Sequence, residues 1–188
     1  MSNHIIDFEG AQLEHLHELF KKIAEGNVIL FLGAGASVTD EKKFMSYEVM
    51  ELYQTKLGRD FGTKDIVEFV DMLQEQRDLS RKDFDNFVDS LLRRLPVTEA
   101  HKTLASIPWR QIITTNYDLL VERAFDEVAN TSNEKFKLIR VRKKQEYSFH
   151  TANNEVKYIK LNGSIEDKKE YPLVFSSNDF KEARKFYK

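Results

Sequence analysis

The chain of 188 residues contains no cysteine. Disulfides, thiol nucleophiles and zinc sites built on thiolates are therefore excluded. No apolar run approaches the roughly 18 residues that a membrane span requires, and the N-terminus lacks the pattern of a signal peptide. From these absences we expect a cytoplasmic protein with no membrane partner.

The sequence also lacks an excess of charge of either sign. Its 29 Lys and Arg residues nearly balance 31 Asp and Glu residues, so the net charge is −2 and bulk electrostatics give no reason to expect a nucleic-acid partner. A short basic run contains Arg140, Arg142, Lys143 and Lys144, and a solvated hairpin explains it more simply than nucleic-acid binding. The hydrophobic fraction of 41% fits a globular protein.

The apolar pattern predicts an α/β fold, with a Rossmann-like parallel sheet flanked by helices and a helical insertion after the first strand. The first strand is VILFL at 28–32, and its continuous apolar run is typical of a parallel strand buried on both faces. Helical spacing then continues over about 41–96 and ends at Pro96. Further strands are predicted at 111–114, 136–141, 156–161 and 173–175, with a polar hairpin between the second and third of these, and further helices at 9–25, 99–106, 119–125 and 177–187.

A turn of small residues, GAGAS at 33–37, follows the first strand directly. Gly33 and Gly35 can take positive φ and carry no Cβ, so their backbone N–H groups can approach a pyrophosphate closely. Ser37 adds a hydroxyl donor. A GxG turn alone is a weak signal, and at this point a purely structural turn remains an equal alternative.

The strand at 111–114 runs into TTNYD at 114–118, polar groups at the place where a parallel sheet binds ligands. Asn116 and Asp118 could hydrogen-bond ribose hydroxyls or a carboxamide there. The alternative is local: Asn116 caps the next helix, and Asp118 lies in its first turn opposite the helix dipole.

A third polar segment, KLNGS at 160–164, follows the predicted strand 156–161. Asn-Gly is a strong turn signal, so this segment could simply reverse the chain. Its position at a strand end matches the positions of the other two motifs. The sequence therefore predicts three polar strand ends that converge on one crevice.

In this order, GAGAS, ITTNYD and KLNGS resemble the sirtuin-type NAD-binding fold, in particular the sirtuin-like domains of bacterial anti-phage defence proteins. The resemblance implies an NAD glycohydrolase that cleaves NAD to nicotinamide and ADP-ribose, with NAD as its substrate and no metal. It implies that the glycine turn binds phosphates and that the second motif binds ribose and base. The residues implied are Gly33, Ala34, Gly35, Ala36, Ser37, Thr115, Asn116, Asp118, Gly163 and Ser164 for NAD binding, and Asn116 and Asn162 for catalysis.

Two departures from the family pattern bear on activity. Deacetylase sirtuins have a four-cysteine zinc module and a loop close to GIPDFR, whereas this chain has no cysteine and has VTDEKK at 38–43, which favours cleavage of NAD by water over deacetylation. Asn162 stands where the family has a catalytic His, and a carboxamide cannot accept a proton near neutral pH. Losing a general base costs about 10² to 10⁴ in rate. Either the chain is an engineered inactive form, or it is a natural member that binds NAD without efficient turnover.

Two other classes of function compete with the hydrolase. A catalytically silent sensor or assembly domain that binds NAD or ADP-ribose is the alternative to the hydrolase. A dehydrogenase is disfavoured because GAGAS is not GxGxxG, and the segment that follows is helical where a second strand ending in an acidic residue is required.

The resemblance also predicts the organisation of the protein. A sirtuin-like sheet continues past the position of Lys188, so we expect 1–188 to be a single domain and an N-terminal fragment of a longer protein. Toxic NAD depletion needs an inactive state, so we expect a homo-oligomer and further domains or a partner protein that control activity. His101 is expected to be a core or helix-terminal histidine, Trp109 to pack in the core, and His150 is a weak candidate for the missing base.

Overall fold

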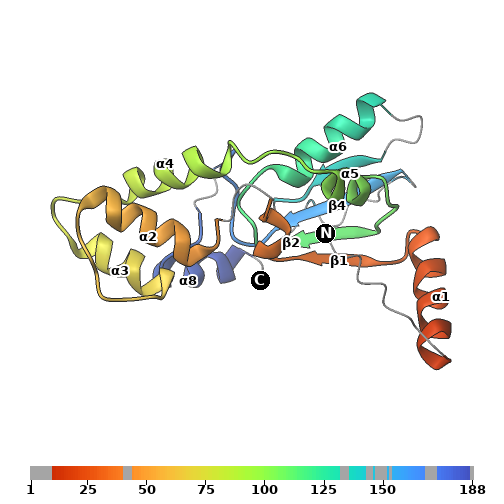
Figure 1. Cartoon of the computed structure of the whole chain (residues 1–188), viewed down its shortest axis with the longest axis horizontal. Coiled ribbons are helices and arrows are strands. Elements are labelled where there is room, and N and C mark those ends of the chain that lie inside the picture. The colour runs from red at the N-terminus through yellow and green to blue at the C-terminus, as the bar shows by residue number, and fades with distance from the viewer. Residues whose placement is uncertain are drawn as a thin grey trace.

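The computed structural model describes residues 10–39, 44–131, 136–142, 146, 152, 154–167 and 173–186. Helices and strands alternate along the chain much as the sequence predicts (Figure 1). The elements are α1 (Ala11–Ala24), β1 (Ile29–Leu32), η1 (Ala34–Ser37), α2 (Ser46–Leu57), α3 (Ile66–Glu75), α4 (Arg81–Leu92), α5 (Glu99–Ala105), β2 (Gln111–Thr114), α6 (Leu120–Thr131), β3 (Lys137–Arg140), β4 (Glu155–Lys160) and α8 (Ser177–Phe186).

The four strands form one parallel sheet in the order β1-β2-β4-β3. Leu32 pairs with Thr114, and Thr114 pairs with Lys160, so β1, β2 and β4 end side by side. Their carboxyl ends face α2, α3 and α4 (Figure 1). The predicted α/β fold with a parallel, Rossmann-like sheet is confirmed.

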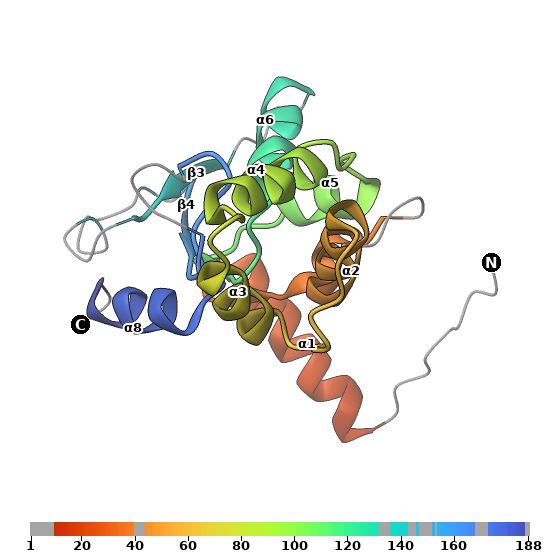
Figure 2. The same cartoon turned by 90° about the vertical axis from the view of Figure 1, so that its left-hand side faces the viewer.

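Helices α2, α3 and α4 form a helical lobe in the predicted place after the first strand (Figure 2). Their apolar residues recur at helical spacing and meet in one buried core, which includes Tyr53, Phe69 and Phe84. Asp65 caps α3 by accepting the backbone N–H groups of Val67 and Glu68 at 2.7 and 3.1 Å. The lobe therefore has its own hydrophobic core beside the strand ends.

A second core holds the sheet against α5 and α6. Ile112 of β2 and Ala124 of α6 are fully buried in it. Trp109 packs against this core and donates its indole N–H to the carbonyl of Leu104 at 2.9 Å, which confirms its predicted packing role.

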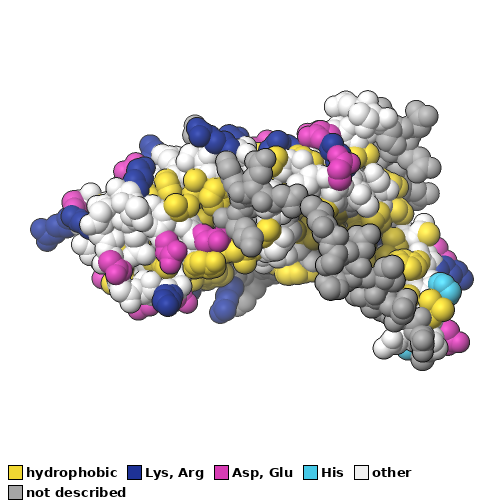
Figure 3. Space-filling model, in the orientation of Figure 1, with side chains coloured by type: hydrophobic (Ala, Val, Ile, Leu, Met, Phe, Trp, Pro, Cys, Tyr) yellow, Lys and Arg dark blue, Asp and Glu magenta, His cyan; other side chains and the backbone are white. Residues whose placement is uncertain are grey.

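Strand β1 is not buried on both faces, so that prediction is wrong. Within the described residues β1 pairs only with β2, and the side chains of Ile29 and Phe31 are 51% and 60% exposed. Leu30 and Leu32 pack on the opposite face, against the sheet core. More apolar side chains, including Phe20, are exposed on α1 (Figure 3). No helix of the described residues has the length and hydropathy of a membrane span.

The predicted hairpin between the strands at 136–141 and 156–161 is also wrong. Strands β3 and β4 pair in parallel, with Leu138 opposite Val156. A tight turn joins only antiparallel neighbours, because the chain must return to the same end before a parallel strand begins.

The segment 173–175, predicted as a strand, forms no sheet pairing in the structure. Its apolar side chains are buried, and Leu173 and Phe175 belong to the core of the helical lobe. The N–H of Val174 donates to the carbonyl of Asn162 at 2.9 Å. The apolar run therefore reflects burial without strand pairing.

Helix α8 starts at a side-chain cap. The N–H of Asp179 donates to the Ser176 hydroxyl at 3.1 Å, and one Asp179 oxygen accepts the N–H groups of Phe175 and Ser176 at 3.0 and 2.8 Å. Arg81 of α4 contacts the same oxygen at 2.8 Å. Burial would raise the pKa of Asp179, but the backbone donors and Arg81 outweigh it and hold the pKa below 3.8.

Replacing Asp179 with Asn tests this anchor. Because the folded-state pKa lies below the unfolded value, the carboxylate contributes stability above the unfolded pKa and loses it as the pH falls through the folded pKa. We expect Asp179→Asn to lower the free energy of unfolding by about 1–3 kcal/mol at neutral pH. The difference should shrink below pH 3.8. Urea unfolding at a series of pH values measures both effects.

Asp78→Asn is the control for this prediction. Asp78 pairs with Arg59 at 2.6 Å, but both side chains are about half exposed, so 1 M salt should remove the effect of that substitution. The effect of Asp179→Asn should persist in the same salt. An equal stability difference at every pH would contradict the role assigned to Asp179.

Candidate functional site

The glycine turn leaves its backbone open. The N–H of Ala36 donates to the carbonyl of Gly33 at 2.9 Å and begins η1. Neither Gly33 nor Gly35 has positive φ, which corrects the reason the sequence suggested for them. A Cβ added at either position would meet nothing within 4 Å. The protein's own packing therefore does not require glycine here, and the free space fits the close approach of a ligand.

The first two motifs are joined by side chains. The Ser37 hydroxyl donates to Oδ2 of Asp118, and Nδ2 of Asn116 donates to the Ser37 oxygen at 2.8 Å and to the Gly33 carbonyl at 2.9 Å. A carbonyl only accepts, so these contacts fix which end of the Asn116 amide is nitrogen. No described residue donates to Oδ1 of Asn116, which leaves an acceptor at the edge of the turn.

Asp118 is turned into the protein, with 4% of its surface exposed. Its second oxygen accepts the N–H of Leu120 at 2.9 Å at the start of α6. Asp118 precedes α6 and caps its start rather than lying in its first turn, and Asn116 bonds the glycine turn instead of capping α6. Ser37 uses its one hydroxyl proton on Asp118. Contacts of Ser37 and Asp118 with a ligand stay predictions.

The third motif contacts the second. Nδ2 of Asn162 donates to the carbonyl of Thr115 at 3.3 Å, and the N–H of Leu161 donates to the carbonyl of Thr114 at 2.8 Å. Gly163 has φ of 87°, a conformation that strongly favours glycine. Ser164 is buried and accepts the N–H of Glu166 at 3.4 Å. All three predicted strand-end motifs therefore meet at one edge of the sheet.

Tyr117 lies beside Asn162 and is not suited to act as a base. Its hydroxyl donates to the carbonyl of Val174 at 2.7 Å, and its ring lies 4.5 Å from that of Phe175. Burial raises the pKa of Tyr117 well above its ordinary value, and the Asn162 amide offsets this only in part. The phenol therefore keeps its proton at neutral pH.

His101 supports the glycine turn from behind. Nδ1 accepts the N–H of Thr98 at 3.0 Å at the start of α5, so the neutral ring carries its proton on Nε2. Nε2 then donates to the carbonyl of Ala36 at 2.7 Å. His101 is 6% exposed, which confirms the prediction of a core or helix-terminal histidine. His150 lies outside the described residues.

Two buried charged residues at this edge were not singled out from the sequence. Nζ of Lys160 lies 2.9 Å from Oε1 of Glu122, and the two side chains are 9% and 5% exposed. The signal was present: side chains alternate along a strand, so Lys160 shares the face of Val156 and Tyr158, and both of those are buried. A lysine on a buried strand face needs a buried acid as partner.

Comparison with known proteins agrees with this geometry. Residues 110–188, which contain the second and third motifs, match the SIR2-like domain family. The chain contains a SIR2-like domain. The resemblance predicted from GAGAS, ITTNYD and KLNGS is thereby confirmed.

Curated relatives match most of the chain. The chain is 26% identical over 162 residues to the NAD(+) hydrolase ThsA of Bacillus cereus, covering 85% of this chain and 32% of the relative. It is 30% identical over 150 residues to the enzyme of that name from Enterococcus faecium, covering 77% and 29%. For the Acinetobacter baumannii protein the identity is 26% over 131 residues, covering 69% and 27%. The chain thus spans between 27% and 32% of the length of these relatives.

Two residues of the basic run beside β3 form ion pairs in the SIR2-like domain. Arg140 pairs with Glu166, and Arg142 pairs with Asp167. Lys143 and Lys144 lie outside the described residues. These pairs agree with the preference for a solvated surface over nucleic-acid binding.

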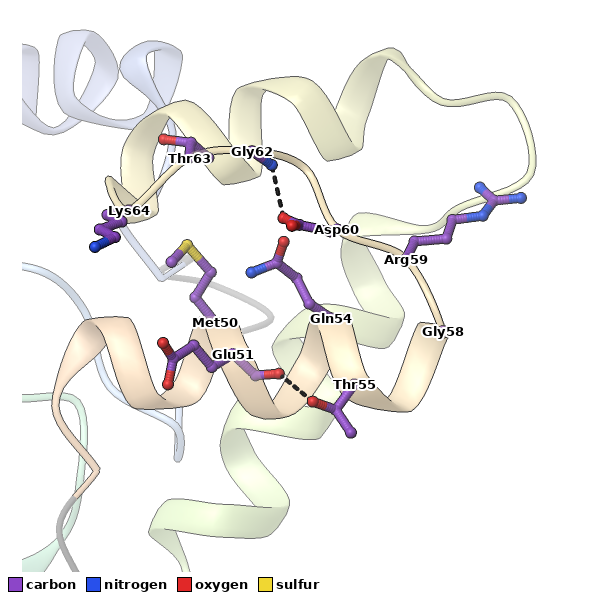
Figure 4. A pocket seen from close by; sticks show the side chains of 10 residues that line it. All are labelled: Met50, Glu51, Gln54, Thr55, Gly58, Arg59, Asp60, Gly62, Thr63 and Lys64. Atoms are coloured by element: carbon purple, nitrogen blue, oxygen red, sulfur yellow. Dashed lines mark hydrogen bonds between the residues drawn. The ribbon is translucent and has the colours of Figure 1, made fainter.

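A separate cavity of about 780 Å³ lies on the helical lobe, away from the strand ends (Figure 4). Gln54 projects into it and accepts the N–H of Phe61 at 2.7 Å, whereas Arg59 points away. Within the described part of the chain, no three His, Asp or Glu side chains gather as metal ligands. The lining residues are Met50, Glu51, Gln54, Thr55, Gly58, Arg59, Asp60, Gly62, Thr63 and Lys64.

Two glycine substitutions distinguish a glycine that its backbone conformation requires from one that it does not require. We expect Gly35→Ala to leave stability unchanged or to raise it by about 0.4–1 kcal/mol, because the space is free and φ is ordinary. Gly163→Ala should lower stability by about 1–2 kcal/mol, because φ is positive there. Urea unfolding of both variants measures this, and equal losses would contradict the open backbone at Gly35.

Proposed function

We propose that the strand-end crevice binds NAD and that this SIR2-like domain belongs to an NAD glycohydrolase. One observation carries the proposal: the three motifs are hydrogen-bonded together at the carboxyl ends of β1, β2 and β4, beside a glycine backbone with free space around it. Ligands of open α/β sheets bind at this place. The relatives named NAD(+) hydrolase support NAD as the ligand.

The glycine turn would hold the pyrophosphate through its backbone N–H groups, with Gly33 and Gly35 allowing the approach. Asn116 would offer Oδ1 to a ribose hydroxyl or to the attacking water, because its Nδ2 is engaged by Ser37 and Gly33. Ala34, Ala36, Thr115, Gly163 and Ser164 complete the proposed NAD contacts, and Asp118 holds Ser37 in place.

In the proposed reaction, the bond between nicotinamide nitrogen and ribose breaks through an oxocarbenium-like state. The electron pair of that bond goes to the ring nitrogen, which loses its positive charge as nicotinamide leaves. Water then adds to the ribose carbon and gives up one proton. The products are nicotinamide and ADP-ribose.

Asn162 limits this reaction. A carboxamide cannot accept the proton released by water, so turnover should be about 10² to 10⁴ below that of a variant with a base at this position. The same observation favours a second candidate function, a silent sensor of NAD or ADP-ribose that acts by changing its assembly. Binding without turnover distinguishes the sensor from the hydrolase.

The biological setting is part of the proposal. The resemblance to defence proteins supports a bacterial anti-phage effector acting in the cytoplasm, where NAD is available. Because toxic NAD depletion needs an inactive state, we propose that further domains, a partner protein or self-association hold the effector inactive. No metal is required by the proposed reaction.

Asn162→His tests the hydrolase. We expect nicotinamide release from NAD to rise by about 10²-fold or more, because imidazole accepts a proton near neutral pH. Asn116→Ala in the same background should abolish the release. Chromatographic measurement of nicotinamide against time gives both rates, and Asn130→His, an exposed position on α6, is the matched control.

Calorimetry with NAD and with ADP-ribose completes this test. An Asn162→His protein that binds NAD but releases no nicotinamide would exclude the hydrolase and leave the sensor. A chain that binds neither ligand would overturn both functions.

A further inference from the structure

A buried cluster lies directly behind the proposed NAD site, at the junction of β4 and α6. Lys160 ends β4, and Glu122 lies in the first turn of α6. Their charged atoms are 2.9 Å apart, with side chains 9% and 5% exposed. The Tyr158 hydroxyl donates to the other Glu122 oxygen at 3.3 Å. None of these three side chains is among the proposed NAD contacts.

The ammonium group of Lys160 connects two of the three motifs. It donates to the carbonyl of Asp118, and it lies 3.4 Å from the carbonyl of Tyr117 and 3.3 Å from the Ser164 hydroxyl. One cation therefore holds two consecutive peptide groups of the second motif and a side chain of the third. Glu122 holds the cation in turn.

The contacts continue to the glycine turn. The backbone of Asp118 is held by Lys160, and its carboxylate accepts the Ser37 hydroxyl. Ser37 in turn accepts from Asn116, whose Nδ2 also donates to the Gly33 carbonyl. Displacing the peptide groups at 117 and 118 would therefore displace Asn116 and the glycine turn as well.

The ion pair is a poor source of stability. Removing each ion from water costs several kcal/mol, and mutual attraction in the interior often does no more than offset this. Burial raises the pKa of Glu122 despite the neighbouring Lys160, in agreement with this cost. The pair does, however, hold the groups that it contacts in fixed positions.

We infer that Lys160 and Glu122 are positioning residues for the proposed NAD site. They set the positions of Asp118 and, through Ser37, of Asn116, without touching the ligand. The inference rests on the proposed function. It implies that site geometry and fold stability can be separated by substitution.

The double variant Lys160→Met with Glu122→Leu removes both charges and keeps similar side-chain volumes. We expect its melting temperature to equal or exceed that of the parent chain, because apolar replacement of a buried ion pair is often neutral or stabilising. Its affinity for ADP-ribose, measured by calorimetry, should fall by about tenfold or more, because small displacements of positioning groups weaken a site strongly. Hydrogen exchange at residues 115–121 should become faster.

Lys137→Met with Glu155→Leu is the matched control. This Lys–Glu pair, 3.5 Å apart, joins the starts of β3 and β4 at the other end of the sheet. It should leave affinity for ADP-ribose unchanged. Should the first double variant fail to fold, Glu122→Gln preserves shape and should lower affinity to a smaller extent.

Unchanged affinity and unchanged exchange at 115–121 in a folded variant would overturn the positioning role. A lower affinity that merely follows a lower melting temperature would also overturn it, since that is the result of general destabilisation. If the parent chain binds neither NAD nor ADP-ribose, the proposed function fails by itself. Exchange at 115–121 then still decides whether the pair fixes this segment.

Discussion

The hydroxyl of Ser37 and the carboxylate of Asp118 join two stretches of chain that are 81 residues apart. Two further contacts meet at this junction, because Asn116 bonds to Ser37 and His101 donates to the carbonyl of Ala36, the residue next to Ser37. The junction is possible only because β1 and β2 are parallel neighbours, so that their carboxyl ends lie at the same edge. Sheet topology therefore determines which side chains can form a site.

The sequence was sufficient for most helices and strands, but not for which strands pair with one another. Continuous apolar residues predicted the strand at β1, yet the same run occurs in central and edge strands, because pairing depends on distant residues. The length of the connection argued against a hairpin: about 14 residues separate β3 from β4, whereas hairpin loops have about 2–5 residues. For 173–175, three apolar residues were too few to separate strand pairing from simple burial.

The same limit applies to the site. Strand-end position was enough to predict that the three motifs meet, because parallel strands share one edge. The partners within that edge were not predictable, since the bonds of Ser37 with Asp118 and of Lys160 with Glu122 join residues far apart in sequence. Sequence patterns locate polar residues, whereas the partner of each hydrogen bond depends on how the chain folds. Asp118 shows the difference: its place at a strand end was predictable, whereas its hydrogen bonds with Ser37 and Leu120 were not.

The all-parallel sheet also has a consequence for how the chain acquires its structure. The strands that the structure describes pair only in parallel, and the contact between Thr114 and Leu32 closes a loop of 82 residues. Such closure costs chain entropy before any pairing compensates for it, so sheets of this kind fold slowly. Helices α2 to α4 make mostly local contacts and can form early. The site, which needs three strand ends at once, is therefore among the last parts of the molecule to be completed.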